Sequence, residues 1–328
     1  MDGTIGHKHP RGAVRGSRLP ATLIIGAAVI LAAGALMLAD AGMRGWAVMP
    51  RDPIPPPQGW FGSLARAVAN DVTPIFWAAY ILLLDGLLVR LRGGSPARER
   101  PRRFVLCCLA SIPIWVVFDW INFDFMHAWA YHGLADNFWH RNLGYAVAFA
   151  AITPGMLMTA EVLRAVGFPE VRLRPIRIGP TGRMLMVVAG GAALIFPIWI
   201  ADPIGSLTLW LSFWLVLDPI NHRFGAPSLI GDWSEGRWGR TLALAAGGGI
   251  CGLWWESWNW FATTKWTYDL PFLGPLEAWA YFEMPLIGFL GFLPFGPECW
   301  VMFNSCVLLA SRLGLRGVEP PADRRSCV

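Results

Sequence analysis

Apolar positions gather into eight long stretches along the chain, separated by polar segments and by segments containing Pro and Gly. Most approach the ~20 residues that a helix needs to cross a bilayer. The last stretch is too long for one straight helix, and Pro285, Pro294 and Pro297 are expected to kink or divide it. The pattern predicts eight membrane-spanning helices, over residues 20–42, 72–91, 104–123, 142–167, 184–201, 203–220, 240–261 and 279–313.

The composition agrees with this pattern. Hydrophobic types make up 55% of the 328 residues and charged types 15%, against about 25% charged residues in a soluble domain. A soluble globule and a disordered chain are therefore both excluded. The net charge of +5 is explained by basic membrane loops, so we predict membrane lipids as partners and no nucleic acid.

Basic residues alternate in density between successive loops. With the N-terminus inside, inner segments hold 22 of the 27 Lys and Arg residues and outer segments hold 5. The outer five are Arg44, Arg51, Arg66, Arg141 and Lys265. This asymmetry predicts a cell-membrane protein with both termini cytoplasmic. The first apolar run also resembles a signal peptide, but its cleavage would remove a helix that the repeat below requires.

The chain repeats itself. One set of matches has an offset of 137 residues: Arg103/Arg240, Asp119/Glu256, Asn122/Asn259, Trp129/Trp266, Tyr131/Tyr268 and Glu161/Glu298. A second set, upstream, has an offset of 133: Trp77/Trp210, Asp85/Asp218, Arg90/Arg223 and Ser95/Ser228. Each half would hold four helices, and an even number gives both halves the same orientation.

We therefore predict an all-α polytopic bundle of about eight transmembrane helices in two parallel four-helix repeats. Its parts are a basic cytoplasmic tail at 1–19, a first repeat at 20–167, a cytoplasmic linker at 168–183, a second repeat at 184–313 and a cytoplasmic tail at 314–328. The sequence leaves the oligomeric state open.

Acidic residues within apolar stretches are the main indication of function. Placing a carboxylate at a helix centre costs ~2.5–3.5 kcal/mol on insertion scales, so such groups face the protein interior and usually have a task. The candidates are Asp85, Asp119, Glu161, Asp218, Glu256, Glu283 and Glu298. Six of the seven belong to the repeat pairs.

An acid followed by Asn three residues later occurs in both halves, as Asp119 with Asn122 and Glu256 with Asn259. This spacing puts the carboxyl and the amide on one helix face. Burial among the nearby Trp side chains would favour an un-ionised carboxyl, which can protonate a carbon–carbon double bond while indole rings stabilise the resulting cation. The same pairs are equally suited to hydrogen bonding between helices, and both interpretations stay open.

We expect a catalytic set of Glu256 or Asp119 as proton donor, Asn259 and Asn122 as orienting groups, and Glu298 or Glu161 as counter-base or second acid. A substrate pocket would be lined by Trp255, Trp258, Trp266, Tyr268, Trp129, Tyr131 and Glu283. Trp129, Tyr131, Trp266 and Tyr268 follow the third and seventh helices, where an interfacial aromatic belt or loop anchors are the first interpretation and the pocket is the second.

Metal and nucleotide chemistry is weakly indicated. His127, His132 and His140 gather in one outer segment, but their spacing is unusual for a metal site and the second half has no counterparts. The sequence has no Walker loop and no dinucleotide fingerprint. We therefore predict neither a metal nor an organic cofactor.

The segment Lys265-Trp266-Thr267-Tyr268-Asp269, with Gly274-Pro275-Leu276-Glu277 after it, resembles the integral-membrane lycopene cyclase domain family. The first half shares only Trp129-Ala130-Tyr131. The resemblance implies duplicated helical units and proton-initiated ring closure on a carotenoid without net redox change. Glu277 is followed by Ala278, where that family has a second glutamate.

Three functions are consistent with these patterns. The first is a membrane enzyme that cyclises or isomerises a lipid-soluble, isoprenoid-like substrate by protonation. The second is a proton-coupled carrier, and the third is a non-catalytic membrane scaffold. An enzyme predicts a Trp-lined cavity, a carrier predicts a polar path reaching both faces, and a scaffold predicts satisfied acids without a cavity.

Overall fold

The computed structural model describes residues 18–319, and the chain over this range is all-α apart from two short ribbons. Most of the predicted basic tail at 1–19, and the part of the C-terminal tail beyond residue 319, lie outside the described residues. The helices are α1 (Ala21–Met43), α2 (Gly59–Asn70), α3 (Val72–Arg92), α4 (Pro96–Glu99), α5 (Pro101–Ile121), α6 (Phe138–Ala165), α7 (Pro180–Ile200), α8 (Ser206–Arg223), α9 (Leu229–Ser234), α10 (Gly239–Phe261) and α11 (Phe289–Arg312).

The predicted last span is divided, as its prolines indicated. Residues 279–288 form β3 (Ala280–Tyr281), β4 (Met284–Pro285) and a 3₁₀ turn before α11 begins at Phe289. Pro294 and Pro297 are both accommodated inside α11. The other ribbon joins β1 (Trp129–His132), just after α5, to β2 (Lys265–Tyr268), just after α10.

Seven helical segments within residues 18–319 are long and apolar enough to cross a membrane, so the chain is a multi-pass membrane protein. They are Ala21–Met43, Val72–Arg92, Pro101–Met126, Phe138–Ala165, Pro180–Ile200, Pro203–Arg223 and Leu286–Arg312. The remaining predicted span, α10, has 23 residues but carries Trp, Asn, Glu and Gly in place of uniformly apolar residues. Its passage through the membrane stays a prediction.

The low hydropathy of α10 has a structural reason, because α10 lies inside the bundle against α6 and α11. Gly248 lets α10 approach α11 so closely that a β-carbon there would meet the carbonyl of Phe292 and the backbone of Gly296. A helix covered by protein needs no lipid-compatible surface, and small residues are what permit such close packing.

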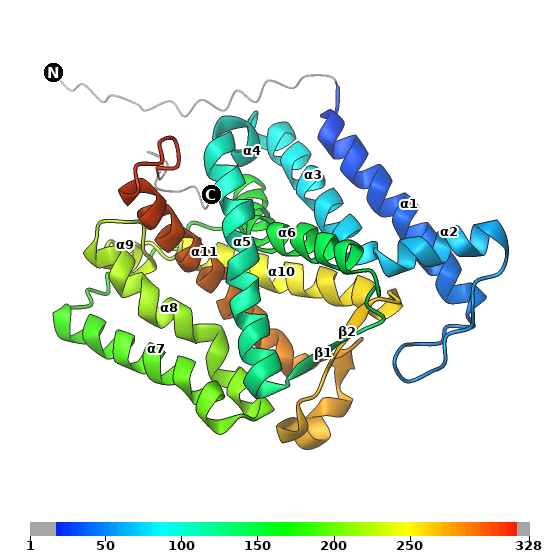
Figure 1. The fold of residues 1–328 in the computed structure, drawn as a ribbon. Helices are drawn as coiled ribbons and strands as arrows, with labels where there is room; N and C mark the ends of the chain where they lie inside the picture. The colour runs from blue at the N-terminus through cyan, green and yellow to red at the C-terminus, as the bar shows by residue number, and fades with distance from the viewer. Residues whose placement is uncertain (1–17, 320–328) are drawn as a thin grey trace.

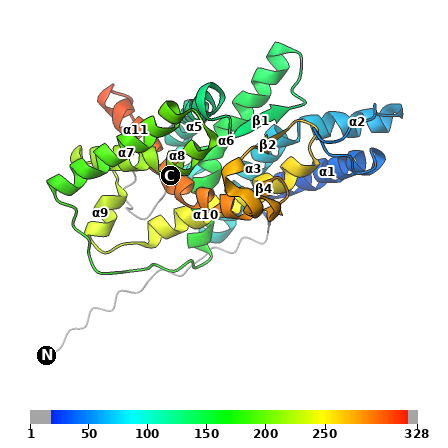
Figure 2. The same cartoon turned by 90° about the horizontal axis from the view of Figure 1, so that it is seen from below.

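Both halves pack their helices in the same order. In the first half α1 contacts α3, α3 contacts α6, and α6 contacts α5; in the second, α7 contacts α8, α8 contacts α11, and α11 contacts α10. Figures 1 and 2 place α1 and α2 at one end of the molecule and α7 and α9 at the other, with α6 and α10 between them. This equivalence is what the predicted four-helix repeat requires.

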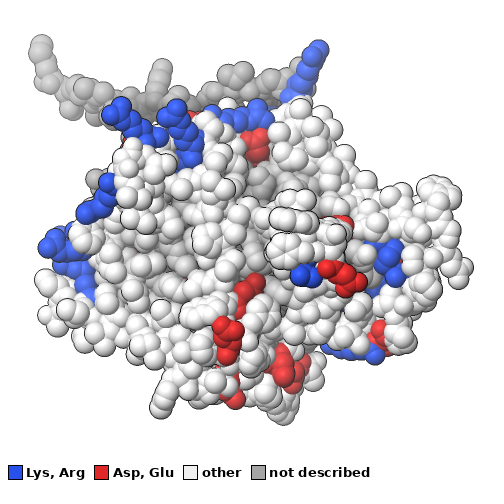
Figure 3. All heavy atoms as spheres, viewed as in Figure 1, with Lys and Arg blue, Asp and Glu red and all other residues white. Residues whose placement is uncertain are grey.

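The outermost helices present apolar side chains outward. Leu31 on α1 is 73% exposed and Trp199 on α7 is 82% exposed, with many Leu, Ile and Val neighbours also uncovered. In Figure 3, Lys and Arg side chains gather beside α4 and along the left edge, Asp and Glu gather lower down, and uncharged surface lies between them. Lipid is the environment that suits this surface.

Replacing Gly248 with Ala should destabilise the bundle by about 1–3 kcal/mol, because the added methyl group overpacks the α10–α11 contact. Thermal unfolding in detergent micelles would measure the loss. Gly191→Ala on α7 is the matched control, since a β-carbon there meets no atom within 4 Å. Equal stability of the two variants would contradict the proposed close packing.

Candidate active site

The end of α5 and strand β1 are tied together by polar side chains. The amide of Asn122 donates to the Trp129 carbonyl at 2.7 Å and accepts from the Trp129 N–H at 3.0 Å. Asp119, one turn earlier, accepts from the Trp129 indole at 3.1 Å and from the Tyr131 hydroxyl at 3.0 Å. The acid–Asn spacing thus serves two purposes: Asn fixes the strand, and the strand presents its Trp and Tyr to the acid.

The second half repeats this arrangement at the end of α10. Asn259 bonds the N–H and carbonyl of Trp266 at 3.0 and 2.9 Å. Glu256 accepts from the Tyr268 hydroxyl at 2.7 Å and from the Trp266 indole at 3.3 Å. The aromatic-belt alternative is wrong for Trp129 and Trp266, which are buried and bonded to acids.

Strands β1 and β2 pair with each other across the two halves. Trp129 lies opposite Tyr268, and Tyr131 lies opposite Trp266, in an antiparallel register. This register has the symmetry of the 137-residue offset. If each residue is replaced by its counterpart in the other half, the pair Trp129–Tyr268 becomes the pair Trp266–Tyr131. The ribbon therefore brings the two acid-containing units beside one another.

Both units border one cavity of about 1300 Å³, a figure that includes its open mouth. Its aromatic lining comes from six helices and both strands of the ribbon. The lining includes Trp77, Trp115, Trp129, Tyr131, Tyr145, Phe149, Trp210, Trp255, Trp266, Tyr268, Phe292 and Phe295. Trp255 lies at the centre of this group, 5.1 Å from Trp115 and 5.4 Å from Trp266 between ring centroids.

Asp119 and Glu256 lie behind this lining, and the hydroxyls of Tyr131 and Tyr268 connect them to it. The acids differ in their bonding. Asp119 is 8% exposed, and the single O–H of Tyr131 is shared between its two oxygens at 3.0 and 3.2 Å. Glu256 is fully buried, and its Oε2 has no hydrogen-bond partner among residues 18–319. An ionised carboxylate is costly in such a place, so this geometry favours the un-ionised form of Glu256.

Burial raises the pKa of the Tyr131 and Tyr268 phenols well above the ordinary value, and the adjacent carboxyls reinforce this effect. Both hydroxyls therefore keep their protons at neutral pH. Burial also lowers the pKa of Lys265, although Glu283 opposes this effect.

Eight of the thirteen predicted site residues do not line the cavity. Asp119, Asn122, Glu256 and Asn259 bond the lining strands from behind, and the other four have different surroundings. Glu161 pairs with Arg92 at 2.6 Å, and Glu298 accepts from the backbone N–H of Phe213 at 2.8 Å. Trp258 is buried behind the wall, against Trp77. Glu283 joins Lys265 and Arg51 in an ion-pair group. The structure thus does not bring Glu161 and Glu298 to Glu256, as a counter-base would require.

Sequence reasoning missed several lining residues. Phe149, Phe292 and Phe295 lie inside apolar stretches where nothing separates a cavity wall from ordinary core. Arg141 and Lys265, which also line the cavity, were noted only as outer basic residues. The rarity of outer cations was the one signal that could have identified them.

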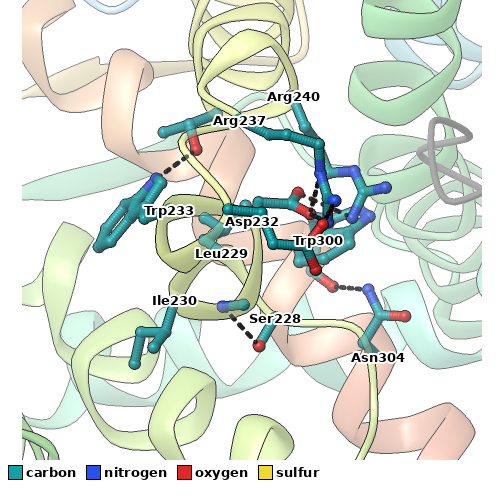
Figure 4. A network of polar contacts seen from close by, with 12 residues as sticks. Ser228, Leu229, Ile230, Asp232, Trp233, Arg237, Arg240, Trp300 and Asn304 are labelled. Atoms are coloured by element: carbon teal, nitrogen blue, oxygen red, sulfur yellow. Dashed lines mark hydrogen bonds and ion pairs between the residues drawn. The ribbon is translucent and has the colours of Figure 1, made fainter. Parts of the chain in front are cut away.

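A separate polar cluster fixes the opposite end of α10 (Figure 4). Asp232 pairs with Arg237 at 2.7 Å and with Arg240 at 3.1 Å. The Arg240 guanidinium also lies 4.8 Å above the Trp300 ring, and Arg103, its repeat partner, lies 4.8 Å above Phe303. Because the carboxylate of Asp232 is paired with two guanidinium groups, we interpret this cluster as structural.

Asp85, near the end of α3, and Asp218, near the end of α8, also have specific partners. Asp85 pairs with Arg98 at 2.8 Å, and Asp218 accepts from the backbone N–H groups of Leu229 and Ile230 at the start of α9. Asp85 and Asp218 therefore anchor the loops that follow α3 and α8.

The predicted histidine cluster does not form a metal centre. His132 bonds Thr267 at 2.8 Å, whereas His140 pairs with Asp71 at 2.9 Å. Within residues 18–319, no three His, Cys, Asp or Glu side chains are grouped to hold a metal ion.

Comparisons of the chain with protein-family models, curated proteins and solved structures find no match.

Alkaline titration should find Tyr131 and Tyr268 among the phenols that ionise late. Tyrosine normally loses its proton near pH ~10, and burial raises the pKa of Tyr131 and Tyr268. The unfolded chain would ionise first, so stability should fall as the pH rises above about 10. Ultraviolet difference spectra would count late-titrating phenols, and Tyr131→Phe and Tyr268→Phe should each remove one. Ordinary titration of both phenols in the folded protein would show that they are not buried.

Proposed function

We propose that the protein is an integral membrane enzyme that cyclises or isomerises an isoprenoid-like substrate by protonating a double bond. The observation that carries this proposal is the Trp-lined cavity with the buried carboxyl of Glu256 behind its wall. One oxygen of that carboxyl, Oε2, has no hydrogen-bond partner among residues 18–319. The resemblance of the Trp266-Thr267-Tyr268 segment to lycopene cyclase domains supports the same chemistry. A scaffold has no use for such a cavity, which favours the enzyme.

In the proposed reaction, the hydroxyl of Tyr268 gives its proton to one carbon of the double bond and receives a proton from Glu256. The other carbon becomes a cation, and a second double bond supplies the electron pair that closes a ring. Indole faces such as those of Trp255 and Trp115 stabilise the cation through their quadrupoles. Positive charge is thereby held away from water, in a cavity whose walls do not react with it.

The reaction ends when the cation loses a proton. Asp119 is suited to accept it through Tyr131, because the Trp129 indole and the Tyr131 hydroxyl both donate to its carboxyl, an arrangement that suits the ionised form. One proton is gained and one is lost, so the product is an isomer of the substrate and no electrons are exchanged. The two repeats would thus have complementary roles at one cavity.

The lining and position of the cavity fit an isoprenoid chain. Its lining is mostly aromatic and lies within a membrane bundle, where lipid-soluble molecules are concentrated.

Glu256→Gln should lower product formation by about 10²–10⁴-fold, the contribution typical of a general acid. The amide is nearly isosteric and still accepts the hydrogen bond from Tyr268. The protein would be expressed in a bacterial host that accumulates acyclic prenyl alcohols, prenyl acids and carotenes. Mass spectrometry of lipid extracts would seek a product of unchanged mass and altered retention.

Two further variants define the role of Glu256. Tyr268→Phe should lower turnover as strongly, because the proton path is broken, while Glu277→Gln, at an exposed acid, should have no effect. Turnover that persists in Glu256→Gln would refute the donor assignment. A folded Glu256→Gln protein is required for the test, so thermal unfolding is measured in parallel.

A further inference from the structure

The cavity changes character from its interior to its mouth. The interior is aromatic, whereas the mouth is bordered by polar and charged residues from the ends of α2 and α3, the β1–α6 loop and the start of α6. The polar and charged lining residues of this region are Asn70, Asp71, Thr73, His140 and Arg141. Asn70 and His140 are exposed, which places this group at the mouth. A purely hydrocarbon substrate would gain nothing from such a rim, since burying polar groups against hydrocarbon is unfavourable.

Four of the five predicted outer cations form ion pairs with acids, two cations to each carboxylate. Arg44 and Arg66 both contact Asp40, at 3.3 and 2.7 Å. Arg51 and Lys265 both contact Glu283. Their positive charges therefore have structural partners.

Arg141 is different. Its guanidinium donates to the Ala135 carbonyl at 3.0 Å, and no carboxylate of residues 18–319 lies within the 4.0 Å of an ion pair. The neighbouring acid at the mouth, Asp71, is engaged by His140 at 2.9 Å. A guanidinium has five N–H donors in a planar fork, so Arg141 keeps most of its donors for a ligand.

We propose that the cavity takes an amphiphile: a single isoprenoid-like chain in the aromatic interior, with a terminal carboxylate or phosphate bound by Arg141 at the mouth. The inference rests on the proposed function only in treating this cavity as the substrate site. Arg141 acts as a specificity-determining residue, because paired charge-assisted hydrogen bonds to carboxylate or phosphate are strong and geometrically selective. It would also fix which end of the chain reaches Tyr131 and Tyr268.

Retinoic acid and retinol are suitable probes, because they share one C20 isoprenoid skeleton, a ring with a polyene chain, and differ at its polar end. Binding to the full-length protein in phosphatidylcholine nanodiscs would be followed by quenching of Trp fluorescence, since indoles line the cavity. Protein-free discs correct for partitioning into lipid. Retinoic acid should bind about ten- to a hundredfold more tightly than retinol, the range expected of a charge-assisted hydrogen bond.

Arg141→Gln should abolish this preference by weakening retinoic acid binding while leaving retinol binding unchanged. Arg51→Gln is the matched control, because it removes another predicted outer cation, one that pairs with Glu283. This variant should keep the preference for retinoic acid. Equal affinities of the wild-type protein for the two probes would refute the inference, as would a preference that survives Arg141→Gln. Failure of both probes to bind would refute it as well.

Competition identifies the source of the head group. Displacement of retinoic acid by millimolar inorganic phosphate would reveal a site for free anions and refute the amphiphile. Displacement by phosphatidylglycerol in the disc would reveal a phospholipid site and refute the isoprenoid. Turnover is not measured in these experiments, so loss of the preference leaves the acid mechanism intact, and failure of the Glu256→Gln test leaves head-group recognition intact.

Discussion

The hydrogen bonds from a Trp–x–Tyr strand to a buried carboxyl are the interaction on which the centre of the molecule depends. Asp119 and Glu256 each lie at the end of a helix, and each receives an indole N–H and a phenol O–H from the strand that follows. These donors offset part of the desolvation cost of placing a carboxyl inside a membrane protein. In return, the carboxyl fixes the orientation of the rings that face the cavity.

Two such units border one cavity. Because β1 and β2 pair in a register that exchanges the two halves, Tyr131 and Tyr268 both line the same space. The units are not chemically identical: one acid is Asp with both oxygens bonded, and the other is Glu with one oxygen unbonded. A symmetric framework with unequal acids suits a reaction in which one proton is added and another is removed.

The distribution of apolar and polar side chains in the surrounding helices matches a lipid environment. α1 and α7 expose Leu, Ile and Val outward, whereas α10 is covered and carries the Gly, Trp, Asn and Glu residues that lipid would not tolerate. Polar groups thus accumulate on the helix with the least exposure to lipid. The same arrangement buries the acids beside the aromatic cavity.

The sequence by itself determined the helical class, the division of the last apolar stretch at its prolines, and the pairing of Asp119 with Glu256 and of Asn122 with Asn259. These features depend on local composition and on periodicity, which any membrane helix must satisfy. Only the tertiary structure decided that Trp129 and Trp266 bond acids inside the molecule, that Glu161 and Glu298 have partners elsewhere, and that Arg141 borders the cavity. The bonds of Glu161 and Glu298 join residues 69 and 85 positions apart, and the two strands that line the cavity pair across 139 positions, as Trp129 with Tyr268. A linear pattern does not encode which face of one helix meets which face of another.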